Sequence, residues 1–488
     1  MNKQPKSILI VGGGTAGWMT ANSLLHAWPN CQITLIESAD IGIIGVGEGA
    51  TPYLKQYFKQ LNIAESEWMP ECDATYKVGI NFEGWSGSEG YDSYFHPFFS
   101  VLDKPIADMF FHNCGLRRRG FEAPVKPDDF FVAKTLSNQK LSPISVNASG
   151  PDIDYAYHFD SVKLGRFLRK KALQKGLHHI VDTVKDVALS ADGAISHILA
   201  EKSGSIAADF FIDCTGFSGR LIHQGLNQQY VSYAKQLFND SAVAIQTPLD
   251  TPKPHPQTRS IAMQAGWMWK IPLTTRVGNG YVYSGSHISA DKAEHELRSR
   301  LGLLENSEIQ VKHLKMRIGR LERHWHQNCL AVGLSQGFIE PLEATALMLT
   351  QLTVERFIAS CSSPDKNLTA SREDYNQSLN NIFDGIRDYI VAHYQLTNRS
   401  DTDYWLDNKN NTDSPAVLSA ILSAWESGGD VERALHANKH SLVYLRPSWY
   451  CILAGMGRFP KDLKSTNNAA QLSQAKEYCQ RVTSQYFE

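Results

Sequence analysis

The hydrophobic positions at the start of the chain form a short run, Ile8 to Val11, that is rich in β-branched residues and carries no charge. Such a run is typical of a strand buried on both faces of a sheet. A helical stretch, 20–25, follows, and a second apolar run, 32–37, predicts the next strand. The order strand, helix, strand predicts a parallel α/β unit.

The pattern further along predicts a second α/β unit. A helix is expected over 160–176, because its apolar residues recur on one face and Gly176 can end it. Strands are expected around 180–187 and 195–200, and a buried strand ending in Asp213 returns the chain to the first sheet. The elements predicted after that are strands within 242–285, a helix over 291–302, a buried strand over 329–333, a helix from about 343, and mostly helices from 368 with polar breaks at 408–414 and 428–429.

Three other stretches have patterns with more than one meaning. Residues 76–82 alternate between apolar and polar, which predicts a half-buried strand with Lys77 as a solvated lysine on its polar face. Residues 116–147 are polar and rich in Arg, Pro and Ser, and they are expected to form irregular surface. Aromatic residues from Tyr91 to Phe111 lack a clean period, so they form either core or the wall of a pocket for a planar ligand.

Glycines separate the first strand from its helix. Gly12, Gly14 and Gly17 have the spacing G-x-G-x-x-G, which suits a tight turn, close approach to a pyrophosphate and close helix–strand packing. Glu37 ends the second strand about 20 residues later, where an acid can accept ribose hydroxyls. The alternative is a glycine-rich turn of an ordinary α/β protein. The strand, glycine turn, helix, second strand and terminal acid together favour a dinucleotide-binding site. Residues 41–52 bring further glycines together and form either a mobile ligand loop or merely a turn, and the number of glycines favours the loop.

The composition mainly excludes certain partners and kinds of site. The 488 residues suffice for about two to three domains. A net charge of −2 makes nucleic acid and anionic membranes poor partners. The eight cysteines contain no C-x-x-C pair, so neither a metal site nor a disulfide framework is expected. Because no signal peptide and no apolar run of membrane-spanning length occur, we expect a cytoplasmic globular protein.

Two motifs identify a family. The segment Gly12-Gly-Gly-Thr-Ala-Gly-Trp18 resembles the nucleotide fingerprint of the flavin-dependent tryptophan halogenases. The segment Trp267-Met-Trp-Lys-Ile-Pro272 is the W-x-W-x-I-P motif that marks them, whereas by chance it would be a buried aromatic strand ending in proline. Further matching stretches are 45–48, 213–217 and 340–345. The resemblance covers most of the chain, in family order and spacing.

The resemblance implies an α/β fold with an FAD-binding Rossmann-like core of the flavin monooxygenase type, a β-sheet substrate region and a mostly helical C-terminal part. The discontinuous FAD-binding module would comprise residues 1–90, 150–225 and 310–365. The substrate-binding region would comprise residues 91–149, 226–309 and 366–488.

An FAD site is implied along the first glycine turn, the end of the second strand, the glycine-rich loop and a later Gly-Leu turn. Its residues would be Gly12, Gly14, Thr15, Ala16, Gly17, Glu37, Gly47, Glu48, Ala50, Val184, Gly333, Leu334 and Leu347. Reduced FAD would use O2 and a halide, chloride or bromide, to make hypohalous acid. The halide would lie by the backbone of Thr345 and Ala346, since N–H groups at a helix start attract anions.

Two residues match the catalytic pair of the family. Lys77 lies in a Y-K-x-G-I strand, and its amine would hold hypohalous acid by hydrogen bonding or become halogenated itself. The Glu343 carboxylate would stabilise the arenium cation and take its proton. His96, Phe98 and Trp449 are the implied substrate pocket. The residues that resemble the plug between flavin and substrate are Trp267 and Trp269.

The sequence departs from the family pattern in two places. The usual E-S-T-G is here Glu343-Ala-Thr-Ala346, which would reshape the halide site while keeping its backbone contact. Tryptophan-specific members hold the amino acid with adjacent tyrosines and a glutamate, but this chain has no Tyr-Tyr pair and no equivalent set around 443–447. Indole, a substituted indole or another electron-rich arene is therefore as well founded an expectation as free tryptophan.

The implied activity is that of an FADH2-dependent halogenase of an indole-type arene or tryptophan. Two alternatives are a single-component flavin-dependent aromatic hydroxylase, in which Lys77 and the W-x-W-x-I-P motif would have no purpose, and a non-catalytic flavoprotein. No second nucleotide fingerprint occurs, which fits a separate flavin reductase that supplies FADH2. The other expected partner is a small aromatic substrate, and a homodimer is compatible with the sequence.

Overall fold

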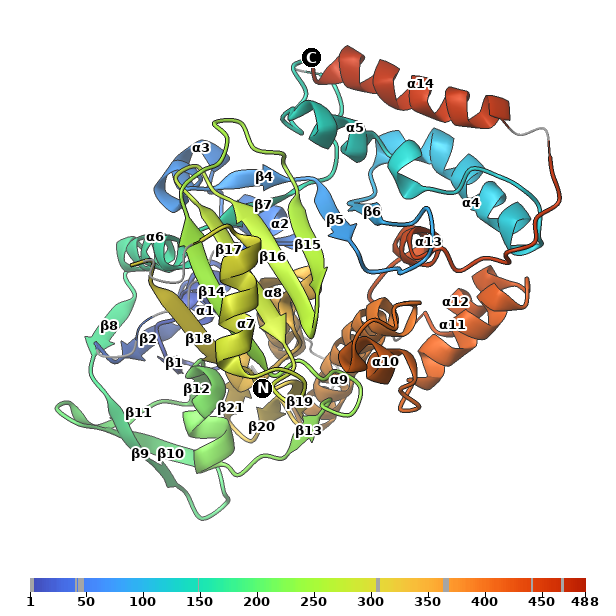
Figure 1. The fold of residues 1–488 in the computed structure, drawn as a ribbon. Helices are drawn as coiled ribbons and strands as arrows, with labels where there is room; N and C mark the ends of the chain where they lie inside the picture. The colour runs from blue at the N-terminus through green and yellow to red at the C-terminus, as the bar shows by residue number, and fades with distance from the viewer. Residues whose placement is uncertain are drawn as a thin grey trace. The chain divides into compact units, whose positions relative to one another are not determined.

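The computed structural model describes residues 4–39, 42, 48–147, 149–303, 308–362, 368–439, 442–466 and 469–488 (Figure 1). The chain forms two compact units, each built from three separate segments. Unit 1 comprises Met1–Ala74, Phe159–Tyr233 and Arg317–Phe383. Unit 2 comprises Thr75–His158, Ala234–Met316 and Asp384–Glu488. The modules expected from the sequence have other bounds than these units: residues 75–90, 150–158 and 310–316 lie in unit 2, and residues 226–233 and 368–383 lie in unit 1.

Unit 1 contains a six-stranded sheet in the order β20-β21-β12-β1-β2-β8. Its strands are β1 (Ser7–Val11), β2 (Gln32–Glu37), β8 (His178–Val181), β12 (Phe210–Asp213), β20 (Trp325–His326) and β21 (Cys329–Ala331). All pairs are parallel except β20 with β21, so the strand–helix–strand prediction at the start of the chain is confirmed. Buried apolar side chains such as Leu9, Ile36 and Phe211 form its core.

Three helices of unit 1 pack around this sheet. They are α1 (Thr15–Ala27), α6 (Ser161–Gln174) and α8 (Ala346–Ser362), and α1 packs against both α6 and α8. The predicted helix over 160–176 is confirmed, with the Asp160 side chain accepting the Lys163 N–H at its start. The other elements of unit 1 are β3 (Glu48–Gly49), α2 (Tyr53–Gln60), α3 (Glu65–Trp68), β9 (Val184–Leu189), β10 (Ile195–Ala200), β11 (Gly204–Ala207), β13 (Tyr230–Ser232), β19 (Gly319–Leu321) and β22 (Gly337–Phe338). Helix α9 (Leu368–Gln395) is divided between the units after Phe383.

Unit 2 is built on a seven-stranded sheet in the order β18-β14-β17-β16-β15-β5-β6. Its strands are β5 (Gly79–Glu83), β6 (Ser93–Pro97), β14 (Ser241–Thr247), β15 (Thr258–Met263), β16 (Gly266–Pro272), β17 (Val277–Tyr283) and β18 (Val311–Lys315). Helix α7 (Ala290–Arg300) lies across one face of this sheet (Figure 1). Its Ala293 and Leu297 pack with Met268 and Tyr281 from β16 and β17.

The remaining part of unit 2 is mainly helical, as the sequence predicts for its C-terminal segment. The helices are α4 (Lys104–Arg118), α5 (Val132–Gln139), α10 (Asp403–Lys409), α11 (Ala416–Glu426), α12 (Val431–Ala437), α13 (Arg446–Gly455) and α14 (Ala469–Tyr486). The expectation of irregular surface over 116–147 is wrong, because α5 lies there and packs against α14. Phe130, Phe131 and Leu136 are fully buried, although the surrounding composition is polar.

The expectation of one half-buried strand over 76–82 is also wrong. Two strands occupy this stretch, β4 (Thr75–Lys77) and β5, and they belong to different sheets. Val78 separates them, and its N–H donates to the Pro256 carbonyl oxygen at 2.8 Å. Lys77 is only 1% exposed, so the local interpretation of a solvated lysine fails. Strand β4 pairs instead with β7 (Ala156–Phe159).

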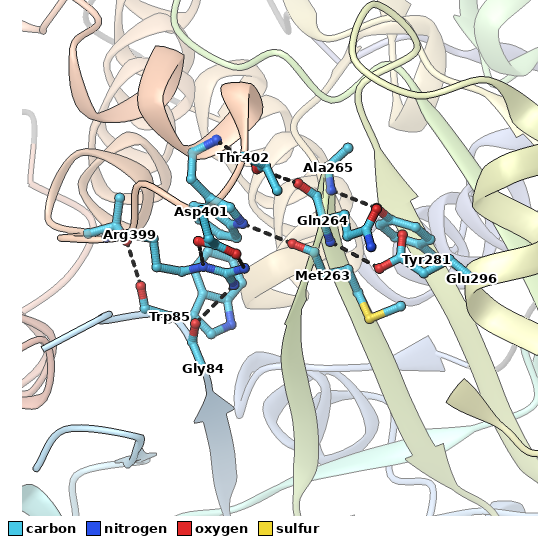
Figure 2. Close-up of polar contacts among 12 residues, drawn as sticks. Gly84, Trp85, Met263, Gln264, Ala265, Tyr281, Glu296, Arg399, Asp401 and Thr402 are labelled. Carbon is cyan, nitrogen blue, oxygen red and sulfur yellow. Dashed lines mark hydrogen bonds and ion pairs between the residues drawn. The ribbon is translucent and has the colours of Figure 1, made fainter. Parts of the chain in front are cut away.

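The hairpin that joins β15 to β16 is fixed by side chains from outside the hairpin (Figure 2). Thr402 Oγ1, at the start of α10, donates to the Gln264 carbonyl oxygen at 2.8 Å. On the other side, the Ala265 N–H donates to Tyr281 Oη at 2.8 Å. These bonds satisfy backbone groups at the turn and hold the start of β16, which carries the W-x-W-x-I-P motif.

Within the described residues, we find no helix with the length and apolar character that spanning a membrane requires. The part of the chain that the structure describes also contains no cluster of three or more His, Cys, Asp or Glu side chains arranged to hold a metal ion. All eight cysteines lie in this part, where they are buried and form no disulfide. Burial raises the pKa of Cys72 to about 12, so this thiol stays protonated and unreactive at neutral pH.

Candidate active site

The first glycine turn of unit 1 has the geometry of a phosphate cradle. Gly12 has a φ of +111°, and a Cβ there would lie 2.3 Å from the Cys214 carbonyl oxygen. Gly17 packs against the same turn, since its Cβ would lie 2.0 Å from the Gly12 oxygen. Gly14 is the residue before α1, and among the described residues no side chain caps the helix there and nothing lies within 4 Å of an added Cβ. The N–H groups at the start of α1 are thus open to an anionic ligand.

Glu37 lies beside this turn at the end of β2. A Cβ on Gly13 would meet Glu37 Oε2 at 1.5 Å. His179 Nε2 donates to Glu37 Oε1 at 2.9 Å, and an Arg169 guanidinium nitrogen lies 3.5 Å from the same oxygen. A carboxylate offers about four acceptor positions, so Glu37 keeps capacity for ribose hydroxyls. Val184 begins β9, two residues after Asp182, whose N–H donates to the Glu37 carbonyl oxygen.

A second glycine turn, 333–335, lies against the first turn of α1. Gly333 has a φ of +74°, and its Cβ would lie 2.7 Å from the Ala16 Cβ. Thr15 Oγ1 lies 3.3 Å from the Ser161 carbonyl oxygen, which links α1 to the start of α6. Leu334 is half-buried in this turn. Unit 1 thus brings Thr15, Ala16, Gly333 and Leu334 together around one helix end.

The glycine-rich loop is described only from Glu48 onward. Gly47 lies outside the described residues, while Ala50 is 1% exposed. Burial raises the pKa of Glu48 to about 7, and the nearby Asp160 carboxylate acts in the same direction. A glutamate with such a pKa is partly protonated at neutral pH, which is typical of groups at functional sites.

The stretch from Glu343 to Leu347 forms the entry to α8. Glu343 ends a short 3-10 turn and is 5% exposed, and Ala344 adopts a left-handed conformation with φ +56°. Thr345 is 2% exposed, Ala346 is exposed, and Leu347 is half-buried. Helix α8 begins at Ala346 and runs for 17 residues, so the N–H groups at its start can attract an anion.

These residues of unit 1 fit an FAD. The uncapped start of α1 and the open space over Gly14 suit a pyrophosphate, and Glu37 suits a ribose. The second glycine turn adds backbone close to Ala16, which a bulkier residue would prevent. The first glycine turn, Glu37 and the second glycine turn lie at the carboxyl ends of β1, β2 and β21, the end at which open α/β sheets bind ligands.

Lys77 belongs to unit 2 and is buried against an aromatic ring. Its Nζ lies 5.4 Å from the centroid of Phe98, within the range of a cation–π interaction. The Phe98 N–H donates to the Val78 carbonyl oxygen at 3.2 Å, which fixes the ring beside the end of β4.

His96 and Trp449 meet through a tyrosine. Tyr389 Oη donates to the Ser448 carbonyl oxygen at 3.0 Å, so it accepts from His96 Nε2 at 2.9 Å. Tyr389 also packs edge-on against Trp449, with ring centroids 5.0 Å apart, and stacks on Tyr444 at 3.7 Å. Sequence reasoning missed Tyr389 and Tyr444, because each looks like an ordinary apolar position of its segment.

Trp267 and Trp269 lie on one face of β16, because side chains alternate along a strand. Their centroids are 6.3 Å apart, and they are 2% and 5% exposed. Met268, between them, faces α7 on the opposite side. Trp269 lies over Gly280, whose Cβ would meet the indole at 2.1 Å. Both tryptophans are fixed by packing within unit 2.

The charged residues next to Trp449 are paired with each other. Arg446 Nε donates to Glu432 Oε1 at 2.6 Å, and Tyr450 Oη donates to the same oxygen at 2.8 Å. The Arg446 guanidinium also lies 3.9 Å from the Phe111 ring centroid. These contacts pair the charges of Arg446 and Glu432 with each other.

Comparisons with known proteins identify the family to which the chain is similar. The Tryptophan halogenase family model matches residues 7–471. The 7-chloro-L-tryptophan 6-halogenase KtzR of Kutzneria sp. (strain 744) is 38% identical over 474 residues, which cover 92% of this chain and 90% of that protein. The tryptophan 6-halogenase SttH of Streptomyces toxytricini is 38% identical over 453 residues, covering 87% of this chain and 84% of that protein.

A solved structure is similar throughout. The thermophilic tryptophan halogenase Th-Hal from Streptomycin violaceusniger has a TM-score of 0.85 and 33% identity, covering 99% of each chain. This likeness confirms the α/β fold with a Rossmann-like core, and the family match does not favour the hydroxylase alternative. The chain therefore belongs to the tryptophan halogenase family and is a flavin-dependent halogenase.

Proposed function

We propose that the chain halogenates an electron-rich arene of the indole type, of which tryptophan is one member. The observation that carries this proposal is Lys77, buried to 1% exposure beside Phe98 in the unit that also holds His96, Tyr389 and Trp449. KtzR and SttH, by name, halogenate 7-chloro-L-tryptophan and tryptophan. An indole ring shares the flat, electron-rich chemistry of those substrates.

Unit 1 would hold the flavin. Backbone N–H groups around Gly14 would bind its pyrophosphate and Glu37 its ribose. The remaining contacts would come from Gly47, Glu48, Ala50, Val184, Gly333, Leu334 and Leu347. When bound, reduced FAD supplies hypohalous acid from O2 and halide. The protein's own part is to bind the flavin at the uncapped start of α1 and to exclude bulk water from it.

The halide, chloride or bromide, would bind at the start of α8. Thr345 and Ala346 offer backbone N–H groups that the helix itself does not use. The helix dipole favours an anion at this end. Ala346 replaces the glycine of the family pattern, and this change leaves the backbone donors in place because a methyl group removes no N–H.

Lys77 would deliver the halogen. Its ammonium donates a hydrogen bond to hypohalous acid, or its amine carries the halogen, and either way one electrophilic halogen is aimed at one ring carbon. The Phe98 ring and the surrounding burial hold the side chain in a narrow range of positions. A halogen positioned in this way reacts with the ring far faster than an equally reactive halogen free in solution.

Glu343 would assist at the ring carbon. A carboxylate that faces the arene stabilises the positive charge that develops as the halogen adds. The same carboxylate then accepts the proton that leaves, which restores the aromatic ring. Its 5% exposure keeps competing water away from the oxygens.

The substrate pocket would recognise the ring more than an amino acid backbone. Arg446 and Glu432 are paired with each other, and no Tyr-Tyr pair occurs in the chain. An ammonium or carboxylate without partners costs about 1–3 kcal/mol per unsatisfied group, and more for a full charge. Indole itself should therefore bind without that cost.

The reaction needs FADH2 from elsewhere, which we propose a separate flavin reductase supplies in the cytoplasm. The test provides reduced FAD from an independent reductase, varies bromide and chloride, and compares indole with L-tryptophan at equal concentration. We expect halide-dependent product, with indole halogenated at least as fast as tryptophan and at its most electron-rich carbon. Mass spectrometry measures the product, and NMR locates the halogen.

Two results would contradict the proposal in different ways. Product formed without halide would argue against halogenation. A strong preference for tryptophan, with halogen at one benzo-ring position, would show that other residues bind the amino acid. Omitting the reductase gives the control for the supply of FADH2, since oxidised FAD alone should then yield no product.

A further inference from the structure

The strand that carries Lys77 is short and held on one side only. Strand β4 has three residues and lies at the edge of its sheet. It pairs with β7 in the register Thr75 with His158, Tyr76 with Tyr157 and Lys77 with Ala156. The chain leaves for another sheet at Val78, directly after Lys77. The position of Lys77 therefore depends on what the side chains of β4 contact.

A chain of hydrogen bonds crosses unit 2 at this strand. Thr75 Oγ1 donates to the Pro272 carbonyl oxygen at 2.7 Å, so its single proton is used there. Towards His158 Nδ1, at 3.3 Å, the Thr75 hydroxyl must accept, which requires a proton on Nδ1. In the neutral ring Nε2 then accepts from Thr258 Oγ1, at 2.8 Å. All bonds of the chain run in one direction, from Thr258 to Pro272.

The environment of His158 agrees with this neutral tautomer. The side chain is fully buried between β4 and β15. Burial, with the positive charge of Lys77 acting in the same direction, holds the pKa of His158 well below its usual range. The ring therefore bridges the two threonines without placing a second positive charge beside Lys77.

The chain of bonds connects two motifs that lie far apart in the sequence. Pro272 ends β16 and the W-x-W-x-I-P motif, and Thr75 lies two residues before Lys77. Thr258 begins β15, which pairs with β5 and with β16. A movement of any of these strands would thus be transmitted to β4.

We propose that His158 is a positioning residue for Lys77, which acts by bridging Thr258 and Thr75 and thereby fixing β4 against the end of β16. The consequence for halogenation rests on the proposed function, whereas the consequence for the position of Lys77 does not. A loosened β4 would leave Lys77 buried but misaligned. A displacement of about 1 Å can cost on the order of a hundredfold in rate.

The test removes one hydroxyl at a time. Thr75→Val keeps the shape of the side chain and removes both of its bonds, whereas Thr75→Ser retains the hydroxyl. We expect Thr75→Val to lower the kcat for halogenated product at least tenfold, and with it the amount of product formed per O2 consumed. The KM for the arene should change less than about twofold. Thr75→Ser should restore most of this loss. Thr247→Val, which removes a hydroxyl bonded to Asn279 in the same unit, is the matched control.

Crystal structures of the same variants give a readout independent of activity. We expect Lys77 Nζ to move away from its 5.4 Å distance to the Phe98 centroid in Thr75→Val, but not in Thr75→Ser or Thr247→Val. Thr258→Val tests the other end of the chain of bonds and serves if Thr75→Val does not fold. An unmoved Lys77 with full yield of product in these two variants overturns the proposal. If the unchanged protein gives no halogenated product but Lys77 moves in Thr75→Val, the proposed function fails and the positioning role stands.

Discussion

Lys77 has a long, flexible side chain that is almost completely buried, so few conformations are open to it. In water the Lys77 side chain would sample many rotamers. Here the Phe98 ring, 5.4 Å from Nζ, and the end of β4 restrict it. Ordering a lysine side chain costs up to about 2 kcal/mol of conformational entropy. The cost is borne before the reaction, so it need not be met again in the transition state.

Replacing Lys77 should separate the formation of the halogenating agent from its use. We expect Lys77→Ala to bind FAD and to consume O2 normally, because those steps depend on unit 1, but to lower halogenated product at least a hundredfold. Lys134→Ala is the matched control, since Lys134 Nζ lies 5.3 Å from the Phe95 centroid and is also largely buried. Oxygen uptake and product are measured together. Halogenation by Lys77→Ala at the rate of the unchanged protein would refute the role of the lysine.

Two glycines of the first turn should respond in opposite ways to a methyl group. Gly14 has a φ of −71° and open space around its Cβ position, so Gly14→Ala should fold normally yet weaken FAD binding at least tenfold. Gly12 has a φ of +111° and no room, so Gly12→Ala should destabilise the protein by about 1–3 kcal/mol. Flavin fluorescence titration and chemical denaturation distinguish the two effects. Normal FAD affinity in Gly14→Ala would show that the flavin lies elsewhere.

At the scale of single elements, the junction before α8 stores strain. Ala344 adopts φ +56° and ψ 38°, a left-handed conformation that costs a residue with a Cβ about 1–2 kcal/mol. It lies between Glu343 and Thr345, so the strained residue sets the direction in which the chain enters the helix. Strain at such positions often accompanies function.

Glycine at this junction should relieve the strain. We expect Ala344→Gly to raise the free energy of unfolding by about 0.5–1 kcal/mol, because the relief exceeds the added entropy of the unfolded chain. Ala434→Gly in α12 is the control, since glycine inside a helix should lower stability by about 1 kcal/mol. Chemical denaturation of the purified variants measures both changes. Equal losses in both would mean that Ala344 is not strained.

Sequence patterns predicted elements well where one periodicity dominates. The strand–helix–strand start, the helix after Asp160 and the breaks in the C-terminal helices are confirmed. The sequence patterns failed at 76–82, because the chain changes sheets at Val78 and is buried on both faces there. They also failed at 116–147, because the polar composition gives no sign of the helix α5. The glycine motif and the family resemblance supplied the candidate site. Bonds such as Thr75 to Pro272 connect distant segments, and no local pattern encodes them.

At the scale of the whole molecule, each unit is assembled from three segments that are far apart in the chain. Unit 1 contains Glu37, Glu343 and the glycine turns, and unit 2 contains Lys77 and the aromatic residues. Neither unit can form its sheet until distant segments have met, so its contacts form late and cooperatively. Substitutions at the site can therefore alter the stability of a whole unit as well as its chemistry.

Glu48 should make the stability of unit 1 depend on pH. Burial raises its pKa from 4.5 to about 7, so between these values the folded protein binds a proton that the unfolded chain releases. Stability therefore falls as pH rises through this window, and the penalty is complete above pH 7. The difference between the folded and unfolded pKa carries about 1.36 kcal/mol per pH unit, and because the Glu48 side chain is only half-buried, solvent reduces the total to about 1–2 kcal/mol.

The measurement compares free energies of unfolding at pH 5 and pH 8 in urea, without FAD. Glu48→Gln cannot ionise, so relative to the unchanged protein it should be about 1–2 kcal/mol more stable at pH 8 than at pH 5. Glu89→Gln, at an exposed position, should show no such difference and controls for the loss of one surface charge. The same pH dependence in Glu48→Gln and the unchanged protein would mean that Glu48 is ionised throughout. Unit 1 would then keep a half-buried carboxylate charged across this pH range.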